Sequence, residues 1–216
     1  MGRVVFGLNA AVVAVGLVVQ LFAAYDSTEG FFSGRAAALN AFSYFTTQSN
    51  VILAATCLLL ALGFVSRALW FRALRMIGVV GIALTFVVYH VALSDLRELT
   101  SGAKFADVML HTVSPILGVG GWLVFGPRGL TSRAAVAWTT AYVAAWGVFT
   151  MIRGAVVERS DGRRFYPYPF MNAQDEGYPR VVVNLVVVGV VFLAIAAGCH
   201  LLDVWLTRRR GAATRQ

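Results

Sequence analysis

One short segment concentrates the hydroxyl and amide side chains that could do chemistry. Four of its residues follow the helical spacing i, i+3, i+4 and i+7 and therefore share one face of a helix: Ser43, Thr46, Thr47 and Asn50. A threonine hydroxyl acts as a nucleophile when a base lies beside it, and an amide can donate a hydrogen bond to a developing oxyanion. This polar stripe predicts a catalytic surface or, in the alternative, a helix–helix contact between small polar residues.

A matching base occurs in a second polar segment. Asp107 and His111 are four residues apart, so on a helix the carboxylate can hydrogen-bond to the imidazole. A neutral histidine serves as a general base near neutral pH, and a third group usually orients it. Pro115 has no N–H, so the carbonyl of His111 loses its helical partner. We therefore expect an irregular helix lining a cavity at this point, whereas in the alternative His111 only joins a packing network.

Further polar residues are expected in the same layer. At 1.5 Å per residue, Thr46, His90 and His111 lie roughly 5–8 Å below one boundary of the predicted helices. A stiff aromatic segment with two prolines, Tyr166–Phe170, precedes the last apolar block and suits a lid. We assign catalytic roles to Thr46, His111, Asp107 and Asn50. We assign substrate contacts to Ser43, Thr47, His90 and Tyr168, although His90 and the aromatic segment are also typical of interfacial anchors.

The elements that must position these residues are long apolar helices. The chain has 216 residues, of which 59% are hydrophobic and only 13% are charged, against about 25% charged in a soluble domain. A bilayer core of about 30 Å needs about 20 apolar residues per helix. Six blocks fit: Val4–Ala24, Ala41–Phe64, Met76–Ser94, Val108–Phe125, Ala134–Ile152 and Val181–Leu206. The sequence thus predicts an all-α fold, a single domain over 1–216 with six transmembrane helices.

Basic residues predict the orientation of these helices. The first block is too long for the apolar core of a signal peptide, so we interpret it as a retained helix. With the N-terminus inside, ten basic residues face the cytoplasm and eight face outward. We therefore expect both termini in the cytoplasm and a multi-pass protein of the plasma membrane. The net charge of +8 then favours anionic lipids as partners. Nucleic-acid binding is not expected, because the basic residues are scattered over loop ends.

The cysteines give no sign of a cofactor site. Cys57 and Cys199 both lie inside predicted spans, so we expect neither a disulfide framework nor a thiolate metal site. We expect no metal and no other cofactor. One alternative remains, a haem held by His90 and His111 as axial ligands from neighbouring helices.

Three segments carry a resemblance to a known family. They are Tyr44–Asn50, Leu110–Pro115 and Tyr168–Met171, in this order. The chain resembles the androgen-induced-gene-product family and its bacterial relatives, which are six-span membrane proteins. The animal members are threonine hydrolases that cleave esters of branched fatty-acid lipids. The resemblance implies Thr46, or its neighbour Thr47, as nucleophile and His111 as the histidine. Here the histidine lies four residues before the proline, whereas the animal pattern has five.

Two main functional hypotheses follow. The first is an intramembrane hydrolase of long-chain lipid esters, with a lipid-like substrate. The second is a non-catalytic membrane protein that binds or transports a lipid or small molecule, or acts as a regulator, through the same cavity. No carboxylate lies in the middle of a predicted span, which argues against a proton-driven pump.

Overall fold

The computed structural model describes residues 1–27, 30–94, 101–159 and 161–213, with the side chains of 210–213 left out. Within these ranges the protein is all-helical and contains no β-strand. The longer helices are α1 (Gly2–Asp26), α3 (Phe45–Ala61), α4 (Leu69–Ala92), α6 (Ser114–Phe125), α7 (Arg133–Val156) and α9 (Tyr178–Ala213). The shorter ones are α2 (Gly34–Asn40), η1 (Ala41–Ser43), α5 (Ser101–Val108), η2 (Met109–Val113), η3 (Pro169–Met171) and α8 (Ala173–Glu176).

Five helices are long and apolar enough to cross a membrane. They are α1, α4, the continuous α5–η2–α6 helix, α7 and α9. A sixth crossing exists if α2–η1 and α3, which meet at a bend of 71°, are taken as one broken span. The predicted all-α architecture is therefore confirmed, and the helices indicate a membrane protein.

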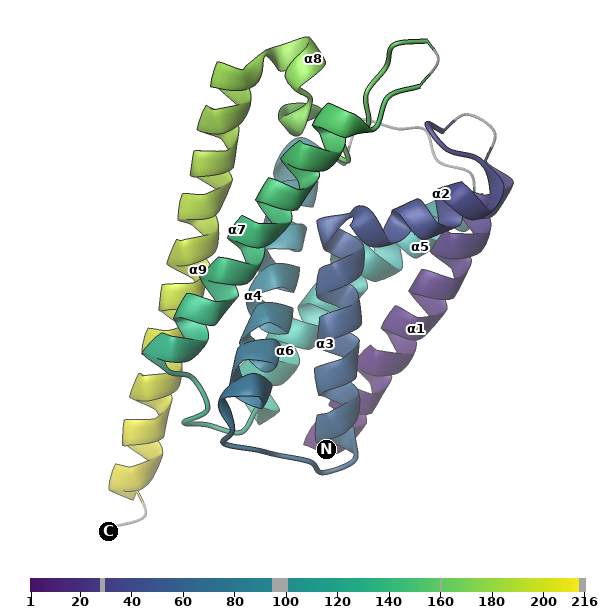
Figure 1. Ribbon diagram of the computed structural model, residues 1–216. Helices are drawn as coiled ribbons and strands as arrows, with labels where there is room; N and C mark the ends of the chain where they lie inside the picture. Colours follow the sequence, from purple (N-terminus) through teal and green to yellow (C-terminus); the bar gives the residue numbers. More distant parts are fainter. Residues whose placement is uncertain (28–29, 95–100, 160, 214–216) are drawn as a thin grey trace.

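The second predicted span differs from the structure in shape. The sequence predicts one helix from Ala41, but the backbone at Tyr44 is extended (φ −75°, ψ 137°) and interrupts it. Helix α3 begins only at Phe45, so Thr46 lies in its first turn. Helix α2 runs at an angle across the end of the bundle instead of continuing α3 (Figure 1).

Two further helices begin earlier than hydrophobicity alone indicates. Helix α4 begins at Leu69 rather than Met76, because Arg72 and Arg75 lie within its first turns and face other protein segments instead of lipid. The fourth spanning helix begins at Ser101 rather than Val108. Both helix starts contain charged and small polar residues, so a search for long apolar runs in the sequence does not include them.

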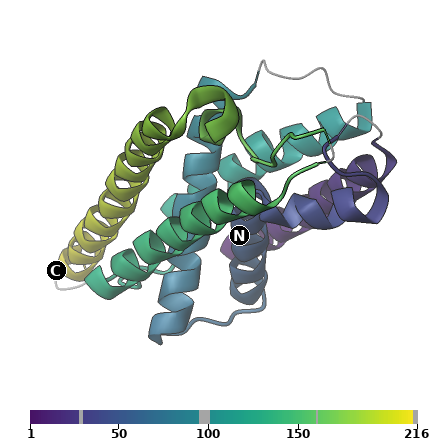
Figure 2. The same cartoon turned by 45° about the horizontal axis from the view of Figure 1, so that its top comes forward.

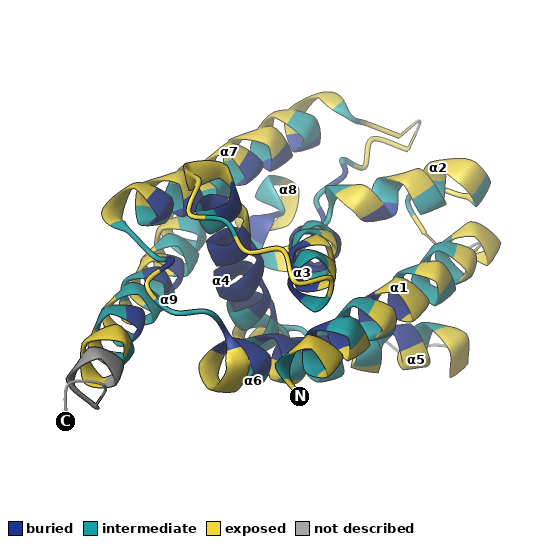
Figure 3. Ribbon diagram, turned by 90° about the horizontal axis from the view of Figure 1, so that it is seen from below, coloured by how far each residue is buried: buried dark blue, intermediate teal, exposed yellow. Residues whose placement is uncertain are grey.

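Helix α4 is the centre of the bundle. Its apolar stretch is 67% buried, whereas none of the other four helices that are long enough to span alone exceeds 33%. Figure 3 shows this helix as the darkest one, with exposed faces on α1, α5, α7 and α9 around it. Helices α3 and α6 pack on one side of α4, with α1 and α5 beyond them, and α7 and α9 pack on the other side (Figure 2). The chain starts and α9 ends at the same end of the bundle (Figure 1).

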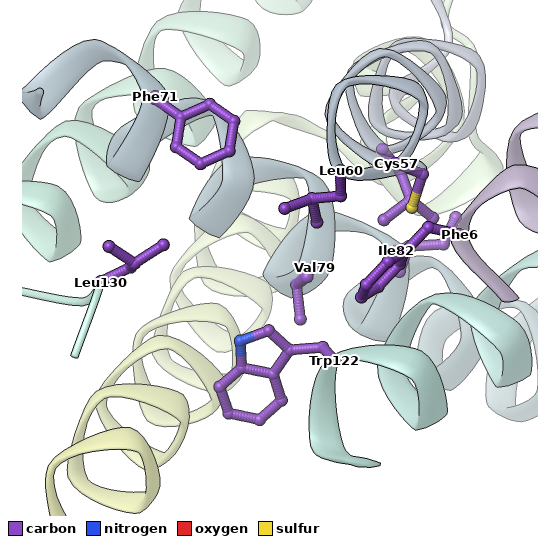
Figure 4. Packing of buried hydrophobic residues seen from close by; sticks show 9 residues of the cluster. Phe6, Cys57, Leu60, Phe71, Val79, Ile82, Trp122 and Leu130 are labelled. Carbon is purple, nitrogen blue, oxygen red and sulfur yellow. The ribbon is translucent and has the colours of Figure 1, made fainter. Parts of the chain in front are cut away.

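Two apolar clusters fill the space around α4. The first joins α1, α3, α4 and α6 and includes Phe6, Cys57, Leu60, Phe71, Val79, Ile82, Trp122 and Leu130 (Figure 4). The second joins α4 to α3, α7 and α9 and includes Phe45, Met76, Val80, Leu84, Trp146, Met171 and Phe192. The second cluster reaches the end of the bundle at which α3 begins, and there it leaves a cavity.

Candidate functional site

The cavity lies between α3, α4, α7, η3 and α9 and is partly open, with about 460 Å³ of empty space counted out to its mouth. Its walls are mostly apolar and include Leu84, Val88, Val143, Trp146, Phe170, Met171, Leu185 and Val188. Only four of its lining residues carry a hydroxyl group: Thr46, Thr85, Tyr89 and Tyr168. An apolar space with a few polar groups is typical of a site for an apolar ligand whose polar part is fixed at one point.

Thr46 occupies the polar wall of this cavity. The break at Tyr44 starts α3 without a side-chain cap, so the N–H groups of the first turn lack helical partners. The N–H of Thr46 donates instead to the hydroxyl of Tyr168, at 3.4 Å, and the Thr46 Oγ1 lies 3.5 Å from the same hydroxyl. The hydroxyl of Thr46 therefore stands at the positive end of a helix dipole, where developing negative charge is stabilised.

Tyr168 is held in place by its own segment. Pro169 starts the short helix η3, and the ring of Tyr168 stacks on Phe170 at 5.4 Å with an interplanar angle of 5°. Burial of the hydroxyl end raises the pKa of Tyr168 to about 12, so the phenol is protonated at neutral pH. The Tyr168 hydroxyl accepts from the Thr46 N–H, and it can also share a hydrogen bond with the Thr46 Oγ1 in which either oxygen is the donor.

The raised pKa of Tyr168 predicts a loss of stability at high pH. The folded protein prefers the neutral phenol, so this preference is fully present below pH 10 and is lost as pH rises through about 12. The change corresponds to at most about 3 kcal/mol. We expect the unfolding midpoint of Tyr168→Phe to fall less than that of wild type between pH 10 and 12. Parallel curves for the two proteins would contradict this assignment.

Asn50 ties the candidate nucleophile to the helix that carries the histidine. Its Nδ2 donates to the carbonyl of Thr46 at 2.9 Å and to the carbonyl of Leu110 at 3.1 Å. Its Oδ1 accepts from the hydroxyl of Ser114 at 2.7 Å. Asn50 is fully buried, and both functions of its amide are used in these bonds. Its position indicates that it fixes Thr46 relative to Leu110, which immediately precedes His111.

His111 lies in a π-helical turn. The proline at 115 removes a helical N–H, and the Ser114 N–H instead donates to the carbonyl of Met109, five residues earlier. This confirms the irregular helix predicted from Pro115. The Nδ1 of His111 lies 3.0 Å from a carboxylate oxygen of Asp107, so the predicted pair is present. An acceptor-only carboxylate favours the tautomer with the proton on Nδ1, which leaves Nε2 free to accept a proton.

Tyr89 connects this pair to the cavity. Its ring lines the cavity and stacks on the imidazole of His111, with centroids 4.2 Å apart. Its hydroxyl donates to the second carboxylate oxygen of Asp107. The same ring makes an edge contact with His90 at 5.1 Å, and His90 in turn lies 3.4 Å from the hydroxyl of Thr112. His90 therefore contacts Tyr89 from the exposed side of this group of residues and not from the cavity.

The structure brings together some predicted site residues and separates others. Thr46 and Tyr168 meet in the cavity, while His111 and Asp107 lie behind Tyr89 and outside the cavity lining. Among the described residues, Thr46 and His111 share no hydrogen bond. Ser43 closes the turn at η1 by donating to the carbonyl of Asn40 at 2.7 Å. Thr47 is fully buried, and its hydroxyl has no partner in the described part of the chain.

Sequence reasoning missed three residues of this arrangement. Tyr89 and Thr85 are four residues apart, so their shared helical face was readable beside His90. Asn9 interrupts the first apolar block, and its buried amide donates to the carbonyl of Ser114 at 3.5 Å.

Within the described ranges, no group of three or more His, Cys, Asp or Glu side chains could hold a metal ion. Comparisons of the chain with protein-family models, curated proteins and solved structures found no match.

Proposed function

We propose that this protein is an intramembrane hydrolase of long-chain lipid esters, with Thr46 as nucleophile and His111 as base. The observation that carries the proposal is the position of the Thr46 hydroxyl. It lies on the polar wall of an apolar cavity, in the first turn of α3, and a protonated Tyr168 contacts it. The resemblance of the three sequence segments to the threonine hydrolases supports it, because it implies Thr46, or its neighbour Thr47, as nucleophile and His111 as the histidine.

The reaction would proceed by acyl transfer. The Thr46 Oγ1 attacks the ester carbonyl carbon as its proton moves to Nε2 of His111, and the tetrahedral intermediate expels the alcohol. His111 returns the proton to the leaving alkoxide, which leaves the acyl group on Thr46. Water then attacks the acyl–threonine ester with His111 as base, which releases a fatty acid and restores the Thr46 hydroxyl. Asp107 keeps the Nδ1 proton in place throughout.

Stabilisation of the oxyanion falls to the start of α3 and to Tyr168. The phenol would donate a hydrogen bond to the oxyanion, and the N-terminal end of the helix would contribute its positive dipole. Asn50 acts as a positioning residue in this proposal, because its amide is committed to Thr46, Leu110 and Ser114. For His111 to reach Thr46, the ring of Tyr89 must shift, since catalytic contacts often close only when substrate binds.

Release of fatty acid is the direct test. The purified protein in detergent is incubated with a panel of lipid esters that differ in chain length and branching, and free fatty acid is measured. In parallel, a lipid-like fluorophosphonate is added and the modified residue is mapped by mass spectrometry. We expect turnover of long-chain esters and a label on Thr46. A label on another residue would move the nucleophile, and absence of turnover would remove the hydrolase.

A non-catalytic lipid-binding protein is the second candidate. It is favoured by the lack of a hydrogen bond between Thr46 and His111 and by the apolar character of most of the cavity wall. In that case a long-chain ester binds and is recovered intact. Saturable binding without release of fatty acid therefore distinguishes the two candidates.

We further propose a plasma-membrane orientation with both ends of the chain in the cytoplasm. The start of α1 and the end of α9 share one end of the bundle (Figure 1), and more basic residues lie at that end. A reporter fused after Gln216 should be cytoplasmic, and one inserted at residues 159–164 should be external. Reporters on the same side of the membrane would contradict the six-span topology.

A further inference from the structure

A second cavity lies at the end of the bundle opposite Thr46. It is a small, partly open hollow between α4, α6, α9 and the connection at residues 126–132, with about 250 Å³ of empty space counted out to its open mouth. Three apolar wall residues, Val79, Trp122 and Leu130, are visible in Figure 4. The polar part of the wall consists of the side chains of Arg72, Arg75 and Thr131. This cavity thus combines an apolar surface with two guanidinium groups.

Arg75 is the unusual member of this wall. It is only 4% exposed, and its Nη2 is buried without a hydrogen-bond partner. Within the described residues, the Arg75 guanidinium makes no hydrogen bond and no ion pair. An arginine does not lose its proton in a protein, and a buried charge is strongly destabilising unless it is paired. The side chain therefore requires an anionic partner.

The acidic residue at this end of the bundle, Asp203, attracts Arg75 electrostatically, but among the described residues the two side chains form no hydrogen bond or ion pair. Asp203 is fully buried, and its carboxylate accepts from the N–H of Gly129 at 3.2 Å and from the N–H of Thr131 at 3.1 Å. It also accepts from the hydroxyl of Thr131 at 2.8 Å. The same Thr131 hydroxyl lies 2.9 Å from the Nδ1 of His200. Its bonds hold the connection at residues 126–132 rather than Arg75.

The surrounding charges leave the cavity positive. The guanidinium of Arg72 donates to the carbonyls of Leu130 and Thr131, at 2.8 and 2.7 Å, so these bonds fix it at the cavity wall. Arg128 lies over the ring of Trp122, 5.5 Å from its centroid. Two arginines therefore line the cavity and Arg128 lies near it, whereas Asp203 is the only carboxylate that the described residues place against this connection.

The backbone is shaped around the Arg75 guanidinium. A Cβ atom at Gly126 would lie 2.6 Å from the Arg75 Nη2 and 2.5 Å from the carbonyl oxygen of Trp122. Only glycine at position 126 allows the guanidinium to stay where it is. A Gly126→Ala variant would therefore displace the guanidinium and the end of α6 without changing any charge.

We propose that this cavity binds an anionic phosphate group through Arg75, with Arg72 beside it. The apolar walls favour the phosphate of a membrane lipid, whose glycerol and first methylene groups would contact Val79 and Trp122. Free inorganic phosphate offers the same chemistry and is the other source. The site is independent of the hydrolase proposal, because it lies at the other end of the bundle and shares no lining residue with the first cavity.

Thermal unfolding in nanodiscs tests this site. Wild type, Arg75→Gln and Arg67→Gln are placed in phosphatidylcholine alone, in phosphatidylcholine with phosphatidylglycerol, and in phosphatidylcholine with inorganic phosphate. Arg67 is exposed and precedes α4 at the same end, so its variant removes the same charge without touching the cavity. We expect the unfolding midpoint of wild type and Arg67→Gln to rise with phosphatidylglycerol. The Arg75→Gln protein should need about tenfold more anionic lipid for the same rise.

Each remaining outcome is decisive. A rise with inorganic phosphate as well assigns the free anion as a ligand, and a rise with phosphatidylglycerol alone assigns the lipid. The proposal would be overturned if the unfolding midpoints of Arg75→Gln and wild type rose equally with the anion. It would also be overturned if neither midpoint rose and Arg75→Gln were more stable than wild type. If Arg75→Gln does not fold, Gly126→Ala replaces it, and this variant should weaken the response while leaving the net charge unchanged.

Discussion

Thr46→Ala and His111→Ala should each lower the rate of ester hydrolysis by about a thousandfold or more, because nucleophile and base act as one unit. Thr46 lies on the cavity wall against Tyr168, and His111 pairs with Asp107 in the π-helical turn. The double variant should lose little more than either single variant, since a unit that lacks one member is already inactive. The measurement is kcat/KM for release of fatty acid from a long-chain ester.

The supporting residues should give graded losses in the same assay. Asp107→Asn keeps the size of the side chain but removes the charge that holds the His111 Nδ1 proton, so we expect a smaller loss than for His111→Ala. Tyr168→Phe removes the hydroxyl that contacts Thr46, and we expect a loss of about 100-fold in kcat. Losses that simply multiply across all these variants would argue against a shared mechanism.

Thr47→Ala is the matched control for Thr46→Ala. The two threonines are adjacent, but Thr47 is fully buried and its hydroxyl has no partner in the described part of the chain. Its removal should leave both turnover and folding close to wild type. A larger loss for Thr47→Ala than for Thr46→Ala would move the nucleophile by one residue. Unchanged hydrolysis by the folded double variant of both threonines would eliminate a threonine mechanism.

The helical architecture was readable from the sequence because transfer of a residue into lipid is a local property. Each apolar block of the sequence corresponds to a helix of the structure, including the first block, which becomes α1. Hydrophobicity does not predict the helical state of residues that contact protein rather than lipid. Arg72 and Arg75 look like loop residues by hydrophobicity, yet both lie within α4 because partners or a cavity inside the protein receive them.

The break before Thr46 was not readable in the same way. The segment around Tyr44 contains no proline or glycine, so nothing local predicts an extended residue between two helices. Tertiary contacts supply the reason, since the ring of Tyr44 packs against Phe165 and Tyr168, more than a hundred residues later. The consequence for the site is large, because the break places Thr46 at a helix start.

Lateral placement was the other part that the sequence could not provide. Spacing along one helix correctly predicted the Asp107–His111 pair and the irregular turn at Pro115. It predicted a shared depth for Thr46 and His111 but could not predict which helices are neighbours. The structure places the ring of Tyr89 against His111 and on the cavity wall with Thr46, and it uses Asn50 as a bridge between α3 and Leu110.

The second large effect is expected at that bridge. Asn50→Leu keeps a similar volume but removes three hydrogen bonds, to Thr46, Leu110 and Ser114. Two of these bonds, to Leu110 and Ser114, join different helices, and at about 0.6 kcal/mol for each the loss is about 1 kcal/mol. This should lower the unfolding midpoint by about 3 °C. Thr140→Val is the control, because its hydroxyl bonds only to the carbonyl of Val136 within its own helix, at 3.0 Å.

The same variants decide between two roles for Asn50. As a positioning residue, it should link stability to activity, so that Asn50→Leu loses both and Asn50→Asp does as well, since a carboxylate cannot donate to the carbonyls of Thr46 and Leu110. As the oxyanion donor that the sequence alone predicts, it should affect kcat while the unfolding midpoint stays near that of wild type. A stable, correctly folded Asn50→Leu protein with a much reduced kcat would therefore return Asn50 to the catalytic group and require its amide to leave the bridge when substrate binds.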